Sequence, residues 1–81
     1  MQTFTKITKL KFKDKRGRIE TYRVVQMDVN DEISYAIYYE RNDHLYLQFK
    51  TKDIGQLNSQ YQGLLAQARE DGKRYQVCRI M

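Results

Sequence analysis

The sequence predicts an α+β fold: a single two-layer domain over residues 1–81, with one amphipathic helix on one face of an antiparallel sheet of four to five strands. Four runs within residues 3–51 alternate between apolar and polar positions, which is the period of half-buried strands. After residue 53 the apolar residues follow the spacing of a helix, and the last residues alternate again. The expected order of elements is therefore ββββαβ.

The first two runs predict a hairpin whose strands cover about residues 3–13 and 18–28. Lysine occupies every second position from Lys9 to Lys15, and apolar residues lie between the first of these lysines. This period of two is typical of a strand with one wet face. The segment DKRG follows, and Gly17 within it tolerates the positive φ of a tight turn.

Burial of apolar side chains sets the expected register of this hairpin. Aligning Lys13 with Arg18 gathers apolar residues on one face, and a slip by one residue would turn Phe12 or Ile19 toward water. The expected pairs are Phe12–Ile19, Leu10–Thr21 and Phe4–Met27 on the core face, and Lys11–Glu20, Lys9–Tyr22 and Ile7–Val24 on the outer face.

A second hairpin is predicted from strands over about residues 32–40 and 44–51. The chain enters it through the turn VNDE and reverses around RND, both of which have turn composition. Pairing Tyr39 with Leu45 separates apolar side chains from polar and aromatic ones. The expected pairs are Tyr39–Leu45, Ile37–Leu47 and Tyr35–Phe49 on the core face, and Tyr38–Tyr46, Ala36–Gln48 and Ser34–Lys50 on the outer face.

The helix is expected over about residues 54–71, followed by a short fifth strand over about residues 74–80. Asp53 and Gln56, three residues apart, resemble a capping box at its start. Gly72 stands where a glycine commonly ends a helix. The side chains expected to face the sheet follow helical spacing: Ile54, Leu57, Tyr61, Leu64, Leu65 and Ala68.

The net charge of +5 is distributed unevenly along the chain. Residues 1–27 carry eight basic and two acidic side chains, residues 28–53 carry three basic and six acidic, and residues 54–81 carry four basic and two acidic. The positive charge therefore belongs mainly to the first third of the chain. Such a localised positive field favours an acidic partner, either nucleic acid or an acidic protein surface.

Residues that commonly carry enzyme chemistry are sparse. His44, the only histidine, lies beside Asp43 at the tip of the second hairpin, which is typical of a solvated turn. Cys78, the only cysteine, has no evident base or cationic site to activate its thiol, and is expected to be a small apolar residue. The carboxylates around the VNDE turn lack the ligand ladder and glycine of a calcium loop. We expect a protein that is not an enzyme, with no cofactor, bound metal or small-molecule substrate.

The same sequence predicts a cytoplasmic location and no contact with a membrane. A lone cysteine forms no intramolecular disulfide, which favours a reducing compartment. Residues 1–15 alternate and lack the continuous apolar segment of a signal peptide. No stretch approaches the roughly 18 apolar residues of a membrane-spanning helix.

The candidate functional region is the face of the sheet that the helix leaves open. The expected registers gather lysines and tyrosines there, and the basic turn of the first hairpin extends it. Lysines neutralise phosphates and bases stack on exposed rings, so this combination suits nucleic acid, single strands included. Basic turn residues also suit the phosphates of a duplex. The candidate binding residues are Lys9, Lys11, Lys13, Lys15, Arg16, Arg18, Tyr22, Tyr38, Tyr46 and Lys50.

An alternative is that the same face binds protein. Tyrosine and arginine are enriched at the centres of protein–protein interfaces, so a homodimer or another assembly would bury the aromatic side chains. The alternative function is therefore a protein-interaction or homo-oligomeric assembly module, for example an accessory protein of a phage or mobile element. The order of four strands and a helix resembles that of whirly and coactivator-type single-strand-binding domains, whose sheet faces bind DNA strands. This resemblance is one of predicted topology and assigns no residues.

Overall fold

The computed structural model describes the backbone of residues 2–79 and the side chains of residues 8–77. Its elements are β1 (Gln2–Lys13), β2 (Ile19–Val29), β3 (Glu32–Arg41), β4 (His44–Thr51), α1 (Ile54–Glu70) and β5 (Arg74–Arg79). The predicted α+β class and the order ββββαβ are confirmed. The predicted fifth strand also included Ile80, which lies outside the described residues.

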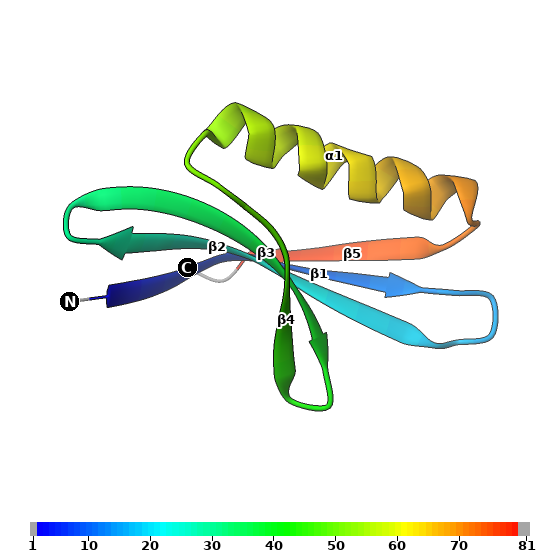
Figure 1. The fold of residues 1–81 in the computed structure, drawn as a ribbon. Helices are drawn as coiled ribbons and strands as arrows, with labels where there is room; N and C mark the ends of the chain where they lie inside the picture. Colours follow the sequence, from blue (N-terminus) through cyan, green and yellow to red (C-terminus); the bar gives the residue numbers. More distant parts are fainter. Residues whose placement is uncertain (1, 80–81) are drawn as a thin grey trace.

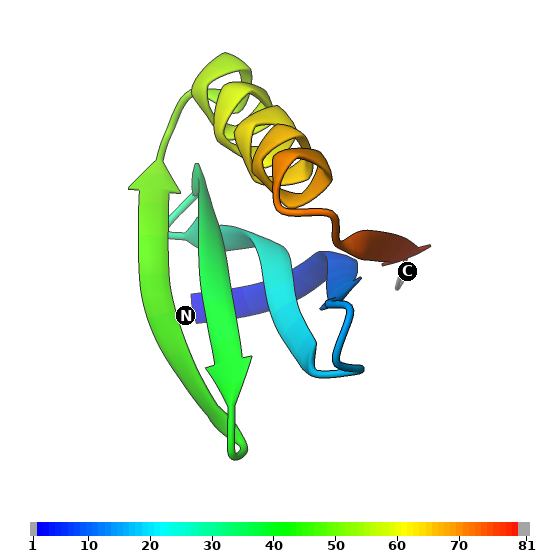
Figure 2. The ribbon, with the colours of Figure 1, turned by 90° about the vertical axis from the view of Figure 1, so that its right-hand side faces the viewer.

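The five strands form one antiparallel sheet in the order β4-β3-β2-β1-β5. Strands β1 to β4 pair with their neighbours in sequence, and β5 returns after the helix to pair with β1. Helix α1 lies across one face of the sheet, while the hairpin of β3 and β4 projects away from it (Figures 1 and 2). The edge strands are therefore β4 and β5.

The two faces of the sheet are defined by their position relative to the helix. The helix face, which α1 packs against, includes Leu10, Val24 and Ile37. The outer face points away from α1 and includes the residues that alternate with these along the same strands, such as Lys11 and Val25. Side chains opposite each other in paired strands share a face, so the register decides which residues each face carries.

Two Asn-Asp turns set the register of β2, β3 and β4. The backbone φ angles are positive at Asn30 (52°) and Asp31 (64°), and again at Asn42 (52°) and Asp43 (65°). Positive φ at both central residues is the signature of a two-residue type I′ turn, whose twist matches that of the paired strands. Asparagine and aspartate tolerate this left-handed conformation better than most residues.

The register of the first hairpin differs from the prediction. Phe12 lies opposite Glu20 and Leu10 lies opposite Tyr22, so Ile19 turns to the outer face and is 61% exposed. Tyr22 instead enters the helix face, with its ring centroid 5.6 Å from that of Phe12. The reason is position: Ile19 is the first residue of β2, at the rim, whereas Tyr22 lies deeper in the strand. Burial of the larger ring therefore decides the register.

An irregularity in β1 explains why the predicted register of the first hairpin is correct for one half of the strand and wrong for the other. At the far end of the hairpin Phe4 pairs with Met27, as predicted. The predicted faces are wrong, because Met27 lies on the outer face and Val24 on the helix face. The register then shifts by one residue between Lys6 and Thr8, and Ile7 has no partner in β2. An extra residue of this kind lets the two halves of a strand follow different registers. The prediction assumed one unbroken register along the whole strand.

The register of the second hairpin also differs from the prediction. Because Asn42 and Asp43 alone form the turn, Tyr39 pairs with Tyr46, and Tyr38 pairs with Leu47. The register shifts by one residue beyond this point, where Gln48 is the extra residue. Tyr38 and Tyr46 were predicted to face each other on the outer face. They lie on opposite faces, with Tyr46 on the helix face beside Tyr39.

Most of the buried side chains lie between α1 and the sheet. The helix-face clusters comprise Leu10, Phe12, Leu65 and Ala68, and Val24, Ile37 and Leu57, with Tyr22, Tyr35, Phe49, Tyr61 and Leu64 packed against them. A smaller cluster on the outer face comprises Val25, Met27 and Ala36, with Tyr38 packed against it. The outer face is thus partly apolar around β2 and β3.

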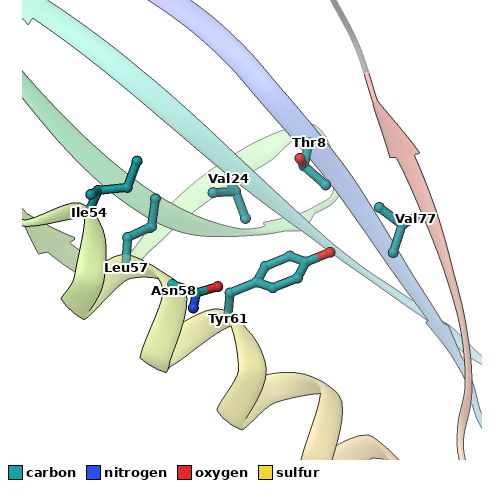
Figure 3. A pocket seen from close by; sticks show the side chains of 7 residues that line it. All are labelled: Thr8, Val24, Ile54, Leu57, Asn58, Tyr61 and Val77. Atoms are coloured by element: carbon teal, nitrogen blue, oxygen red, sulfur yellow. The ribbon is translucent and has the colours of Figure 1, made fainter.

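The start of α1 stands away from the sheet. Ile54 was predicted to be a core residue but is 62% exposed, because it is the first residue of the helix and lies at the rim of the core. Behind it a cleft of about 280 Å³ opens between α1 and strands β1, β2 and β5. Figure 3 shows the side chains that line this cleft: Thr8, Val24, Ile54, Leu57, Asn58, Tyr61 and Val77.

Side chains and backbone groups cap both ends of α1. At the start, Asp53 accepts a hydrogen bond from the Gly55 N–H at 2.8 Å. Gln56 does not complete the predicted capping box: it accepts a hydrogen bond from Thr51 at 2.7 Å, and Thr51 accepts one from the Asp53 N–H at 3.1 Å. Thr51 can reach both groups because it ends β4, only three residues before the first residue of the helix.

At the end of α1 the chain reverses through a Schellman motif. Gly72 has a φ of 69°, and its N–H donates to the Arg69 carbonyl at 3.1 Å. The Lys73 N–H donates to the Ala68 carbonyl at 2.8 Å. This pair of hydrogen bonds around a left-handed glycine satisfies the last carbonyl groups of the helix. It also directs the chain back along the edge of β1 as β5.

Candidate functional site

Strands β1 and β5 bring four cationic side chains together on the outer face. Alternate residues of a strand lie on one face about 6.6 Å apart, so Lys9, Lys11 and Lys13 form a line along β1. Arg74 of β5 lies opposite Lys13, with about 5 Å between the two Cα atoms. We call Lys9, Lys11, Lys13 and Arg74 the cationic row.

Within residues 8–77, no member of the cationic row has an acidic partner. The ion pairs in this range are Arg18–Asp14, Arg23–Glu40, Lys52–Glu32 and Lys73–Glu20. Neighbouring members of the row lie closer together than the roughly 10 Å over which charges interact at 0.1 M salt. Their mutual repulsion makes this part of the surface favourable for an anion that contacts several of them at once.

A balanced ion pair lies next to the row. Arg23 lies opposite Lys9 in β1 and opposite Tyr38 in β3. Its Nη2 donates to the Glu40 carboxylate at 2.9 Å, and both side chains are largely buried. Its Nε is buried and has no hydrogen-bond partner among the described residues. Since Glu40 balances the charge of Arg23, we do not count Arg23 as part of the cationic row.

Lys15 extends the row toward the end of α1. It was predicted as a binding residue in the turn of the first hairpin, and its aliphatic stem lies beside Gly72. A shallow polar depression of about 300 Å³ connects this point to the row, lined by Lys13, Asp14, Lys15, Gly72 and Arg74. The structure thus brings Lys15 together with the predicted Lys13 and with Arg74.

Asp14 organises the turn and balances part of its charge. Its carboxylate accepts hydrogen bonds from the backbone N–H groups of Arg18 and Arg16, each at 2.9 Å. The bond from Arg18, more than that from Arg16, holds the pKa of Asp14 below its usual value. Arg18 Nε also lies 3.3 Å from the carboxylate. Of the predicted turn residues, Arg18 is therefore paired, and Arg16 points into solvent.

Tyr22 does not lie on the predicted binding face. It packs under α1 on the helix face, with its ring centroid 5.6 Å from that of Phe12 and 5.2 Å from that of Tyr39. Burial raises the pKa of the Tyr22 hydroxyl above its usual value. The prediction was wrong here because it depended on the register that Ile19 was expected to set. Tyr22 is partly buried against the core, on the face opposite the cationic row.

The other two predicted tyrosines are separated from each other. Tyr46 is half exposed, but it lies on the helix face beyond the reach of α1, not on the face of the row. Tyr38 lies on the outer face, where it packs against the apolar cluster that comprises Val25, Met27 and Ala36. The predicted surface of three tyrosines beside the lysines is therefore not assembled. The predicted tyrosine positions assumed registers for the two hairpins that differ from those observed, because of the turns and the extra residues in β1 and β4.

Lys50 lies on the outer face, as predicted, but far from the row. It pairs with Ala36 of β3, and strands β3 and β2 separate it from β1. Arg74 was not predicted as a site residue, although its strand was. The signal for it was the alternation of RYQVCRIM, but only the strand order shows that this segment lies beside β1.

The remaining residues with chemical potential are dispersed. His44 begins β4 and is exposed to solvent. Cys78 lies opposite Lys9 in β5, and its side chain is outside the described part of the structure. Across the described residues, no three histidine, cysteine or acidic side chains come close enough to hold a metal ion. The same residues contain no helix long and apolar enough to cross a membrane.

Comparisons with protein-family models, with curated proteins and with solved structures found no match.

Proposed function

We propose that this protein is a non-enzymatic binding protein that contacts the phosphates of nucleic acid through the cationic row. The observation that carries the proposal is the in-register alignment of Lys9, Lys11, Lys13 and Arg74 on one face, without acidic partners in residues 8–77. The lone cysteine favours a reducing compartment, and we propose the cytoplasm as the site of action.

The row suits a polymer of regularly spaced anions. Its lysines repeat about every 6.6 Å along β1, and each carries a flexible stem that lets its ammonium group follow a phosphate. Arg74 adds a second cation beside the end of this line, and Lys15 continues it. Phosphate contacts of this kind supply affinity without reading the base sequence. We therefore expect weak sequence preference.

The surroundings of the row favour a duplex over a single strand. Sequence-tolerant binding of single strands usually depends on exposed aromatic rings on which bases stack. On the face of the row, Tyr38 packs against the buried Val25 and Ala36, while Tyr22 and Tyr46 lie on the helix face. With few rings available, most of the binding energy comes from phosphates, which a duplex presents at higher density.

A salt series with matched oligonucleotides tests the proposal. We expect duplex and single-stranded oligonucleotides to bind at low salt, with the duplex bound at least as tightly, and affinity to fall steeply as salt increases. Changing Lys9, Lys11 and Lys13 together to glutamine should lower affinity by more than about tenfold. The same change should reduce the salt slope by about 0.9 for each phosphate that the variant no longer neutralises.

A control variant with the same loss of charge separates the effect of the cationic row from that of net charge. Arg41, Lys50 and Arg69 are exposed cations outside the row, and changing all three to glutamine removes the same net charge. This control should retain most of the wild-type affinity. Equal losses in the two triple variants would show that net charge alone attracts the nucleic acid. No binding even at low salt would overturn the proposal and leave the row as a contact for an acidic protein surface.

A further inference from the structure

We infer that the exposed edge strand β4 pairs with β4 of a second copy of this chain, in antiparallel orientation, so that two sheets join into one. An edge strand carries backbone N–H and C=O groups on its open side that another strand can pair with. This inference concerns β4, at the far side of the sheet from the cationic row, and does not rest on the proposed function.

The side chains of β4 are unusually exposed for their chemistry. Leu45, Tyr46 and Leu47 follow one another and are 43%, 51% and 54% exposed. The tip of the β3–β4 hairpin projects beyond α1, so the helix covers neither face of the sheet at the tip (Figures 1 and 2). Three consecutive large apolar or aromatic side chains at an open edge favour burial against a partner on both faces of the sheet.

The charges along β4 favour a second copy of the chain as the partner, and an antiparallel orientation of the two β4 strands. Asp43 immediately precedes the strand, while Lys50 and Lys52 lie at its other end. An antiparallel second copy places Asp43 of each chain near the lysines of the other, so opposite charges meet at both ends. Lys52 already contacts Glu32 at 3.2 Å, but both of these side chains are more than two-thirds exposed and free to rearrange. A parallel arrangement would place like charges together.

The extra residue in β4 limits which registers are possible between β4 and β4 of the second copy. On either side of Gln48, Leu45 and Lys50 lie on the outer face, while Tyr46 and Phe49 lie on the helix face. A two-fold arrangement centred between Leu47 and Gln48 places Leu45 opposite Lys50 of the second copy, and Tyr46 opposite its Phe49. Side chains of the same face then oppose each other along the strand, as a continuous sheet requires.

The other edge of the sheet lacks this complementarity. Strand β5 has six residues and carries an arginine at each end, Arg74 and Arg79. Antiparallel pairing of two β5 strands would bring these arginines toward each other, and like charges opposite each other destabilise a sheet. Charged edge residues are a common protection against strand pairing. The contrast between the edges points to β4 as the self-associating one.

The molecular mass in solution tests this inference in the full chain. We expect a dimer in sedimentation equilibrium over a range of protein concentrations. Leu47→Lys places two like charges beside the two-fold axis, and should weaken self-association at least about tenfold while the far-UV circular dichroism stays unchanged. Ile19→Lys is the matched control, because it adds the same charge at a residue of β2 that is also more than half exposed, and this variant should remain dimeric.

Hydrogen exchange locates the contact independently of substitution. We expect the backbone amides of β4 to exchange more slowly as protein concentration rises, while those of β5 do not change. A monomeric wild type at all concentrations would overturn the inference. So would a Leu47→Lys variant as dimeric as the wild type, equal weakening by Ile19→Lys, or concentration-dependent protection in a strand other than β4.

Discussion

Lys73, just after α1, and Glu20, near the start of β2, form an ion pair of 2.9 Å that ties the end of the helix to the sheet. The pair places a carboxylate at the rim of the helix face, where Lys73 balances its charge. Glu20 was predicted to oppose Lys11, and that prediction was wrong. Because Glu20 faces the helix, Lys11 keeps its charge uncompensated on the outer face, among the other members of the cationic row.

This ion pair predicts a loss of stability in alkali. The hydrogen bond from Lys73 to Glu20 raises the pKa of the Lys73 ammonium above its usual value. Since the pKa is higher in the folded chain, the pair stabilises the fold at every pH below the pKa of an unfolded lysine. That contribution disappears as pH rises through the folded-state pKa. Glu20→Gln should therefore lower the free energy of unfolding by about 0.5 kcal/mol at neutral pH, and by nothing in strong alkali.

Urea unfolding of both proteins at neutral and strongly alkaline pH measures this difference. Because Glu20 also contributes to the raised pKa of the Tyr22 hydroxyl, the wild type and Glu20→Gln are compared in a Tyr22→Phe background, which removes that titration. A difference that stays constant into alkali would mean that Glu20 stabilises the fold by some route other than Lys73.

The clusters under α1 predict which leucines matter for stability. Leu10 is fully buried in β1, so Leu10→Ala should leave a cavity and lower the free energy of unfolding by about 3 kcal/mol. Leu47 lies on the edge strand and is more than half exposed, so Leu47→Ala should cost less than about 0.5 kcal/mol. Chemical denaturation at a dilution where the protein is monomeric gives both values. Similar costs for the two substitutions would contradict the assignment of faces.

The Asn30-Asp31 turn predicts opposite effects for two substitutions. Both residues have positive φ, which a β-branched side chain adopts only with strain of about 1 kcal/mol or more. Asn30→Val should therefore lower the melting temperature clearly. Asp31→Gly creates the Asn-Gly sequence preferred in type I′ turns and should maintain or raise it. Thermal unfolding followed by circular dichroism checks both, and an equal loss from the two variants would contradict the turn type.

The fold class followed from local patterns that the structure preserves. The change from a period of two to helical spacing at Asp53, and the glycine at Gly72, locate α1 without any tertiary information. The order of elements then follows. The strand order could not be predicted, because no feature of the segment RYQVCRIM indicates that it pairs with β1. For this reason Arg74 was missed as a member of the row.

The faces of the hairpins could not be read from alternation alone. A single residue without a partner, Ile7 in β1 or Gln48 in β4, transfers every later side chain to the other face. Whether Ile19 or Tyr22 lies on the helix face depends on the position of α1, and local alternation carries no information about that position. The predicted lysines of β1 nevertheless share one face, because they are separated by even intervals on the same side of the irregularity. The predicted tyrosines come from three strands and do not.

The pairing of β5 with β1 has a consequence for the order in which the chain folds. Strands β1 to β4 are joined by short turns, so their contacts close short loops and form early. Joining β5 to β1 brings together the two ends of the described chain, and we expect this closure to limit the folding rate. Arg74 reaches Lys13 only at that step. The four members of the cationic row are therefore brought together only once β5 has paired with β1.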